Sequence, residues 1–193
     1  MSLQRILSPF VEVRKEEAPG ALLMFVYSFL AMAAYNMVQP LTRSKVIQSL
    51  GAVNVPWVIL GSGLIISVLM VGYTRLVGAL PRRWALPITQ GLMAGTMVGF
   101  WLLFGTGAGW VSVVFYVWGA LLGILLISQF WTLANGIYDP RQAKRLFGFV
   151  GGGVTLGGAT GSGLTAVMVQ EVGTNNLLLV SAATLLLCGA IVA

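Results

Sequence analysis

The chain has 193 residues, of which 58% are hydrophobic and 8% are charged. Soluble domains carry about 25% charged residues, so this composition excludes an ordinary soluble protein and indicates an integral membrane protein. The formal net charge of +6 comes from basic residues between apolar runs. No soluble basic face remains, and nucleic-acid binding is excluded.

Six apolar runs follow one another along the chain, each about 17 to 25 residues long, which is the length that crosses a hydrocarbon core of about 30 Å. They contain almost no charge and lack period-two alternation, so helices fit them and strands of a barrel do not. The sequence predicts an all-α polytopic fold, with a cytoplasmic or interfacial segment over 1–19 and a transmembrane domain over 20–193. The predicted spans are 20–38, 55–73, 84–104, 110–134, 146–169 and 177–193.

The segment before the first span has apolar side chains at helical spacing, namely Leu3, Ile6, Leu7 and Phe10. This pattern is typical of a short helix that lies in the membrane interface. A frayed cytoplasmic tail is the alternative.

A polar segment follows the first span. Pro40 is expected to end or kink the helix, and Gln39, Thr42, Arg43, Ser44 and Lys45 surround it. Two cations beside a helix end could attract an anionic solute. The alternative is that both simply lie among the lipid headgroups.

The distribution of basic residues predicts the orientation of the spans. All of the eleven except Arg43 and Lys45 fall on one side of the predicted membrane. Because Lys and Arg favour the cytoplasmic side, both ends of the chain are expected inside. The residues on that side are Arg5, Arg14, Lys15, Arg75, Arg82, Arg83, Arg141, Lys144 and Arg145.

Tryptophans lie close to the ends of the predicted spans, as in the aromatic belts of membrane proteins. We interpret them as interfacial anchors rather than as parts of a cofactor site. They are Trp57, Trp84, Trp101, Trp110 and Trp131, and Trp118 is the exception in mid-span.

A basic, glycine-dense stretch, RQAKRLFGFVGGGVTLGGATGSG, covers 141–163. A phosphate-binding loop needs a preceding strand and a terminal Gly-Lys-Ser/Thr, and this stretch has neither. Gly153, Gly157 and Gly161 recur every four residues instead, and Gly148 and Gly152 form a second such pair. That spacing predicts a helix face on which a neighbouring backbone approaches closely. Direct contact with a ligand is the alternative.

Cys188 is the one cysteine, and the chain has no histidine. The usual zinc, haem and iron-sulfur ligand sets are therefore missing, and so is the histidine base of serine and cysteine hydrolases. We expect neither a metal or other cofactor nor an enzymatic activity.

The central portions of the spans hold only neutral polar side chains, so proton coupling through buried ionisable groups of this half is not expected. The neutral polar residues include Asn36, Ser67, Thr89, Gln90, Ser128, Gln129 and Asn135.

The stretch FWTLANGIYDPRQAKRLFGFVGGGVTLGGATGS, residues 130–162, resembles the junction of the fourth and fifth helices in one group of bacterial transporters. That group is the nucleotide-transporter-like (ATP/ADP translocase-related) branch of the major facilitator superfamily. EAPGALLMFVYSFLAMAAYNMVQPL, residues 17–41, and YTRLVGALPRRWAL, residues 73–86, extend the resemblance over nearly the whole chain.

The resemblance implies the N-terminal six-helix half of a twelve-helix transporter, in which solute binds between the two halves. Two features depart from that pattern. Gly78 stands where the superfamily usually has a gate aspartate, and the acid of the family's Arg-acid pair after the first helix is missing beside Arg43.

Two functions follow. The first is a half-transporter in the bacterial inner membrane, which moves a small anionic solute such as a nucleotide by alternating access against a second six-helix unit, in a homodimer or a larger complex. Its expected substrate residues are Asn36, Gln39, Arg43, Lys45, Lys144 and Arg145, and Arg75, Arg82 and Arg83 form its cytoplasmic gate loop. The second is a structural subunit or assembly factor derived from a transporter and without transport activity.

Overall fold

The computed structural model describes residues 17–79 and 82–192, and every element in these ranges is helical. The all-α prediction is confirmed for this part of the chain, and the expected interfacial helix around Leu3 to Phe10 lies outside it. The helices are α2 (Ala18–Leu50), the 3-10 turn η1 (Ala52–Asn54), α3 (Val55–Ala79), α4 (Arg82–Phe104), α5 (Gly109–Ile137), α6 (Pro140–Glu171) and α7 (Leu177–Val192).

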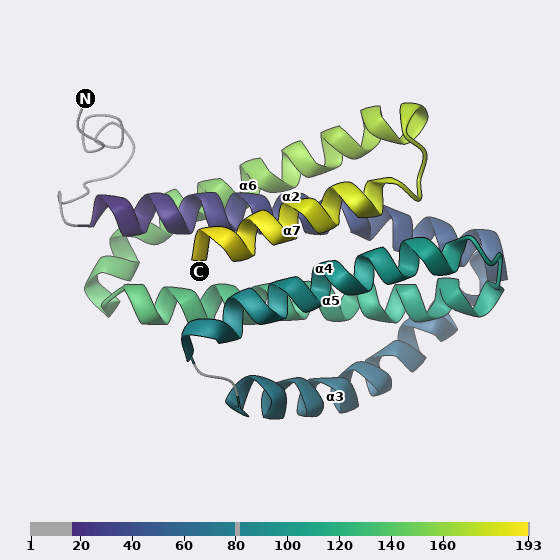
Figure 1. Ribbon diagram of the computed structural model, residues 1–193, viewed down its shortest axis with the longest axis horizontal. Coiled ribbons are helices and arrows are strands. Elements are labelled where there is room, and N and C mark those ends of the chain that lie inside the picture. Colours follow the sequence, from purple (N-terminus) through teal and green to yellow (C-terminus); the bar gives the residue numbers. More distant parts are fainter. Residues whose placement is uncertain (1–16, 80–81, 193) are drawn as a thin grey trace.

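The six long helices of the described part of the chain run alternately in opposite directions (Figure 1). The α2–α3, α4–α5 and α6–α7 connections gather at one end of the bundle, which we call the Lys45 end. The start of α2, the α5–α6 connection and the last turn of α7 gather at the opposite end, which we call the Glu17 end. Short connections between antiparallel neighbours are what a polytopic bundle requires.

Within the described residues, four helices are long and apolar enough to cross a membrane: α2, the stretch Ala52–Arg75 that includes most of α3, Ala85–Phe104 of α4, and α5. The protein thus has the character of a membrane-embedded protein. Many glycine, serine and threonine residues dilute the apolar content of α6, and α7 has 16 residues. The expectation of six spans stays a prediction.

Helix α2 continues past Pro40 to Leu50. Proline removes only one N–H from the helix, and a neighbouring helix can stabilise the turn that it weakens. Here Leu41 and Val46 are buried in the bundle, and Thr42 contacts α5 at Gly119. Packing therefore carries the helix through the proline, and most of the polar segment expected after the first span is helical.

The core forms where α2, α4, α5 and α7 meet. Its largest fully buried side chains include Tyr27 of α2, Met97 of α4, Phe115 of α5 and Leu185 of α7. The lone Cys188 of α7 is fully buried, and its Sγ lies 3.8 Å from the carbonyl oxygen of Tyr27. The first helix is consequently the central one, with neighbours from both halves of the sequence (Figure 1).

Helix α6 lies directly on α2, and glycines make this possible. A Cβ added at Gly153 would lie 2.7 Å from the carbonyl oxygen of Phe25, and one added at Gly157 or Gly161 would lie closer still to the α2 backbone at Phe29 and Ala33. The other predicted glycine pair, Gly148 and Gly152, makes no such close approach. A Cβ added at Gly152 would make an ordinary van der Waals contact, and one added at Gly148 would meet nothing within 4 Å.

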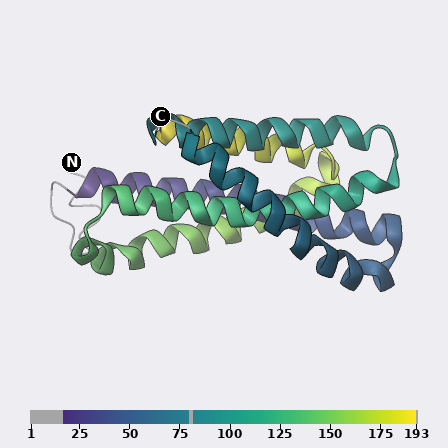
Figure 2. The ribbon, with the colours of Figure 1, turned by 90° about the horizontal axis from the view of Figure 1, so that it is seen from below.

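Helix α3 is the edge of the bundle and crosses the others obliquely (Figure 2). Of its described side chains only Ser62 and Ile66 are buried, and they lie one turn apart on the same face. Leu64 and Val68 on the other side are 77% and 73% exposed. In a membrane protein such a surface meets lipid or another apolar helix.

Candidate functional site

A pocket of about 140 Å³ lies between α2 and α5 towards the Lys45 end. Two of the residues predicted to contact solute, Gln39 and Arg43, line it together with residues that were not predicted. The full lining is Tyr35, Gln39, Thr42, Arg43, Tyr116, Gly119 and Ala120.

Helical spacing brings these residues together. Tyr35, Gln39, Thr42 and Arg43 fall at i, i+4, i+7 and i+8, which is one face of α2. The continuation of α2 beyond Pro40 is what places Arg43 on this face. The pocket therefore depends on the part of α2 that was expected to be a loop.

Two glycines of α5 make room for the α2 side chains. A Cβ on Gly119 would lie 2.5 Å from Cγ2 of Thr42, and one on Gly123 would lie 2.8 Å from the Tyr35 ring. The Tyr35 ring thus lies against bare backbone, which fixes its position beside the pocket. Glycines at these positions were a detectable signal in the sequence, but their partners on α2 were not.

The charge of the pocket comes from Arg43, which is exposed. Among the residues that the structure describes, no carboxylate or carbonyl oxygen accepts a hydrogen bond from its guanidinium. An unpaired guanidinium presents several N–H groups in a plane and suits two oxygens of a carboxylate or phosphate. The pocket can therefore accept an anionic group.

Asn36 lies beside the pocket without lining it. Its Nδ2 donates to the carbonyl oxygen of Met32 at 2.9 Å, and a Cβ on Gly158 of α6 would lie 3.5 Å from the same nitrogen. The side chain thus faces the junction of α2 and α6. Asn36 could contact a solute only through its amide oxygen or through the second hydrogen on Nδ2.

Lys45 is separated from Arg43, although the sequence grouped them. Two residues along a helix correspond to a rotation of about 200°, so the two side chains leave α2 on different sides. The Nζ of Lys45 lies 4.6 Å from the centroid of the Phe104 ring of α4. It lines a different and larger pocket, of about 670 Å³.

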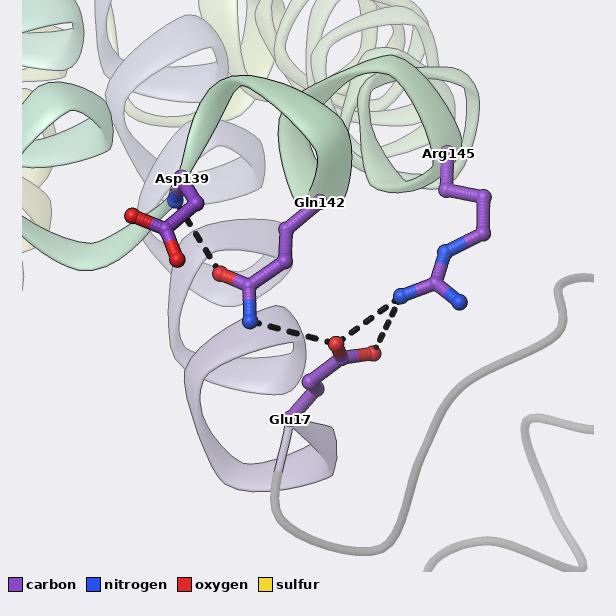
Figure 3. A network of polar contacts seen from close by, with 4 residues as sticks. All are labelled: Glu17, Asp139, Gln142 and Arg145. Carbon is purple, nitrogen blue, oxygen red and sulfur yellow. Dashed lines mark hydrogen bonds and ion pairs between the residues drawn. The ribbon is translucent and has the colours of Figure 1, made fainter.

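Arg145 is held by an acid at the Glu17 end (Figure 3). Its Nη2 donates to both carboxylate oxygens of Glu17, at 2.8 and 2.7 Å, and Nε2 of Gln142 donates to the same carboxylate at 3.2 Å. Oε1 of Gln142 in turn accepts from the backbone N–H of Asp139, as in a capping box at the start of α6. This cluster joins the start of α2 to the start of α6.

Tyr138 strengthens the same junction. Its hydroxyl donates to the carbonyl oxygen of Gly20 at 3.2 Å. Burial, with a smaller effect of the Glu17 charge, raises the pKa of Tyr138 to about 12, so the phenol keeps the proton that it donates. Lys144 is exposed and takes no part in the cluster.

The predicted gate residues lie near the α3–α4 connection. Arg75 is exposed on α3. Arg82 and Arg83 begin α4, and their side chains lie outside the described part of the structure.

A buried network of neutral polar groups crosses the bundle in the half nearer the Glu17 end. Nε2 of Gln90 donates to Oε1 of Gln129 at 2.8 Å and to the Tyr27 hydroxyl at 3.2 Å, and the Tyr27 hydroxyl donates to Oε1 of Gln129 at 3.4 Å. Nε2 of Gln129 donates to Thr89 at 2.9 Å and to Tyr73 at 3.4 Å. The network joins α2, α3, α4 and α5.

The sequence identified three members of this network as neutral polar residues within spans, but not their mutual contacts. Gln90 and Gln129 are 1% and 2% exposed. Buried amides in an apolar bundle need such partners, because an unpaired polar group there is costly. Oε1 of Gln90 is the acceptor in the network without a hydrogen bond.

Comparisons with protein-family models, with characterised proteins and with solved structures give no match for this chain. The pocket between α2 and α5 and the buried polar network are therefore the features on which a functional proposal can rest.

Proposed function

We propose that this chain is one half of a membrane transporter for a small anionic solute, and that the pocket between α2 and α5 is where the solute first contacts it. The observation that carries the proposal is Arg43, a cation without a partner in the described structure, in a pocket that Gly119 and Gly123 open. The two tyrosines of the pocket add hydroxyl groups that can donate to an anion.

The position of the pocket indicates its role. Glu17 and Arg43 are separated by a helical rise of about 39 Å, which is close to the full thickness of a bilayer with its headgroups. If the Glu17 cluster lies at one membrane surface, Arg43 lies at the other. The pocket is then an entry site, and Tyr27, Gln90 and Gln129 lie in the half of the membrane nearer the Glu17 end.

A complete pathway would need a second unit of similar size. In the proposed assembly, a second six-helix unit covers the α2–α5 face, and the solute passes between the units as they rock. The resemblance to nucleotide transporters motivates a nucleotide as solute. In the proposal the Glu17 end faces the cytoplasm of a bacterial inner-membrane protein, an orientation that the same resemblance and the distribution of basic residues support.

Uptake into liposomes tests the proposal. The full chain is reconstituted, and uptake of labelled ATP and of labelled phosphate is measured for the wild type, Arg43→Gln and Arg141→Gln. Loss of a charge-assisted hydrogen bond, worth about 1.5 to 3 kcal/mol, lowers uptake at sub-saturating solute about tenfold or more in Arg43→Gln. The exposed Arg141, at the opposite end, is the matched control.

Absence of uptake of both solutes by the wild type, or equal uptake by the wild type and Arg43→Gln, would contradict the transport proposal. The second candidate, a structural subunit, is favoured by the uncovered apolar surface of α3. The mass of the gently solubilised particle separates the two. Two copies of the 20.5 kDa chain support a homodimeric transporter, whereas a stoichiometric complex with other membrane proteins supports the subunit.

A further inference from the structure

The larger pocket at the Lys45 end has no role in the proposed transport. It has a volume of about 670 Å³ and lies where the end of α4 meets the α6–α7 turn and the last part of α2. Lys45, Trp101, Leu102, Thr174 and Asn176 are among its lining residues.

Lys45 is the one charged residue that lines the pocket in the described part of the chain. The Lys45 ammonium lies over the Phe104 ring at 4.6 Å, a cation-π contact that holds it in place. Among the described residues, none accepts a hydrogen bond from this ammonium. The lining residues include no carboxylate. Nε1 of Trp101 donates to Oδ1 of Asn176 at 2.9 Å, so these two groups satisfy each other. Lys45 is thus the group that an anion would meet.

The level of the pocket in the membrane indicates where that anion comes from. Trp57 and Trp110 lie at the same end of the bundle and are 72% and 61% exposed, as expected of tryptophans among headgroups. Trp101 belongs to the same level and forms part of the pocket wall. Lys45 therefore lies at the height of lipid phosphates.

A partly exposed glycine face of α4 runs from this pocket towards the middle of the bundle. Gly91, Gly95 and Gly99 fall on the same face as Leu102, which lines the pocket and is 62% exposed. A Cβ added at any of these three glycines would find no atom within 4 Å. The glycine face of α6 is filled by the α2 backbone, whereas this one is open.

The length of this face matches one leaflet. The rise from Gly91 to Leu102 is about 16 Å, and half of a hydrocarbon core is about 15 Å. We propose that a phospholipid binds here, with its phosphate at Lys45 and one acyl chain along the glycine face of α4. This site is independent of the solute pocket, because Arg43 and Lys45 leave α2 on different sides.

Thermal unfolding of the detergent-solubilised full chain tests the proposal, with phosphatidylglycerol or inorganic phosphate as the added probe. Phosphatidylglycerol should raise the Tm of the wild type and of Arg43→Gln, the matched control that loses a cation on the same helix. Lys45→Gln should weaken lipid binding about fivefold, since one lysine near an anionic headgroup contributes about 1 kcal/mol.

Gly95→Leu provides a second variant, which covers the glycine face of α4 with a large side chain at a position that faces open space, and leaves Lys45 intact. It should also need more lipid for the same rise in Tm. The proposed site would be overturned if phosphatidylglycerol raised the Tm of Lys45→Gln as much as that of the wild type. It would also be overturned if Arg43→Gln lost as much lipid binding as Lys45→Gln, or if the lipid did not raise the Tm of the wild type. A rise with inorganic phosphate that depends on Lys45 would overturn the lipid as its occupant.

Discussion

At the scale of single residues, the contact between Glu17 and Arg145 ties together two helices that begin far apart in the sequence. The side chain of Glu17 is 8% exposed and that of Arg145 is 35% exposed. Partial exposure lets water screen the pair, which limits its contribution to stability. Its larger effect is geometric, because the Glu17 carboxylate also accepts a hydrogen bond from Gln142 and so fixes the first turn of α6.

We expect Glu17→Gln to lower the free energy of unfolding by about 1 kcal/mol, because it removes a charge-assisted hydrogen bond from a largely buried carboxylate. Thermal unfolding in detergent measures the effect. Lys144→Gln, which removes an exposed cation next to Arg145, should leave the Tm unchanged. If the two variants were equally stable, the Glu17 cluster would have no role in holding α2 to α6.

The polar network yields a second prediction at this scale. Gln129→Met removes four hydrogen bonds at once, those with Tyr27, Thr89, Gln90 and Tyr73. Hydrogen bonds between transmembrane helices contribute about 0.6 kcal/mol each on average. The free energy of unfolding of this variant should fall by about 2 kcal/mol. The free energy of unfolding of Tyr73→Phe should fall far less, since this change removes only the 3.4 Å hydrogen bond from Gln129. Equal losses in the two variants would show that the network does not act as a unit.

At the scale of elements, two glycine faces with the same spacing have different surroundings. The face of α6 meets the α2 backbone, and the face of α4 meets open space. The sequence alone predicted close packing for the first face and could not identify α2 as its neighbour, because spacing within a helix contains no information about which helix lies opposite.

Gly157→Ala and Gly95→Ala test this difference with the same chemical change. The methyl group at Gly157 would overlap the α2 backbone at Phe29 and force the helices apart, which should cost about 1 to 3 kcal/mol. The methyl group at Gly95 meets nothing, so the variant should be unchanged or more stable by up to about 1 kcal/mol from helix propensity. Unfolding of both variants by heat, followed by circular dichroism, gives the comparison.

The course of α2 shows where prediction from sequence reached its limit. Apolar content located the first helix correctly, but Pro40 and the polar residues around it suggested that the helix ends or kinks there. Burial of Leu41 and Val46 against other helices outweighs the local effect of the proline. Once this stretch is helical, Arg43 and Lys45 must point in different directions, and the single site expected from their proximity becomes two.

At the scale of the whole molecule, the all-helical architecture was predictable because apolar runs of the right length leave few alternatives. Two of the seven residues that line the candidate site, Gln39 and Arg43, were also predictable, since they are polar residues at the end of an apolar run. Tyr35, Tyr116, Gly119 and Gly123 were not, because their role depends on the side-by-side placement of α2 and α5. The Arg145–Glu17 pair was missed for the same reason.

The burial of Cys188 has a practical consequence for observing this molecule in motion. A thiol enclosed by α2, α4 and α7 is out of reach of maleimide reagents in the folded protein. The natural chain therefore serves as its own unreactive background, and one new cysteine at Leu64 on α3 with another at Tyr116 on α5 would accept a pair of spin labels. The distance distribution between the labels would report directly whether α3 swings relative to the rest of the bundle.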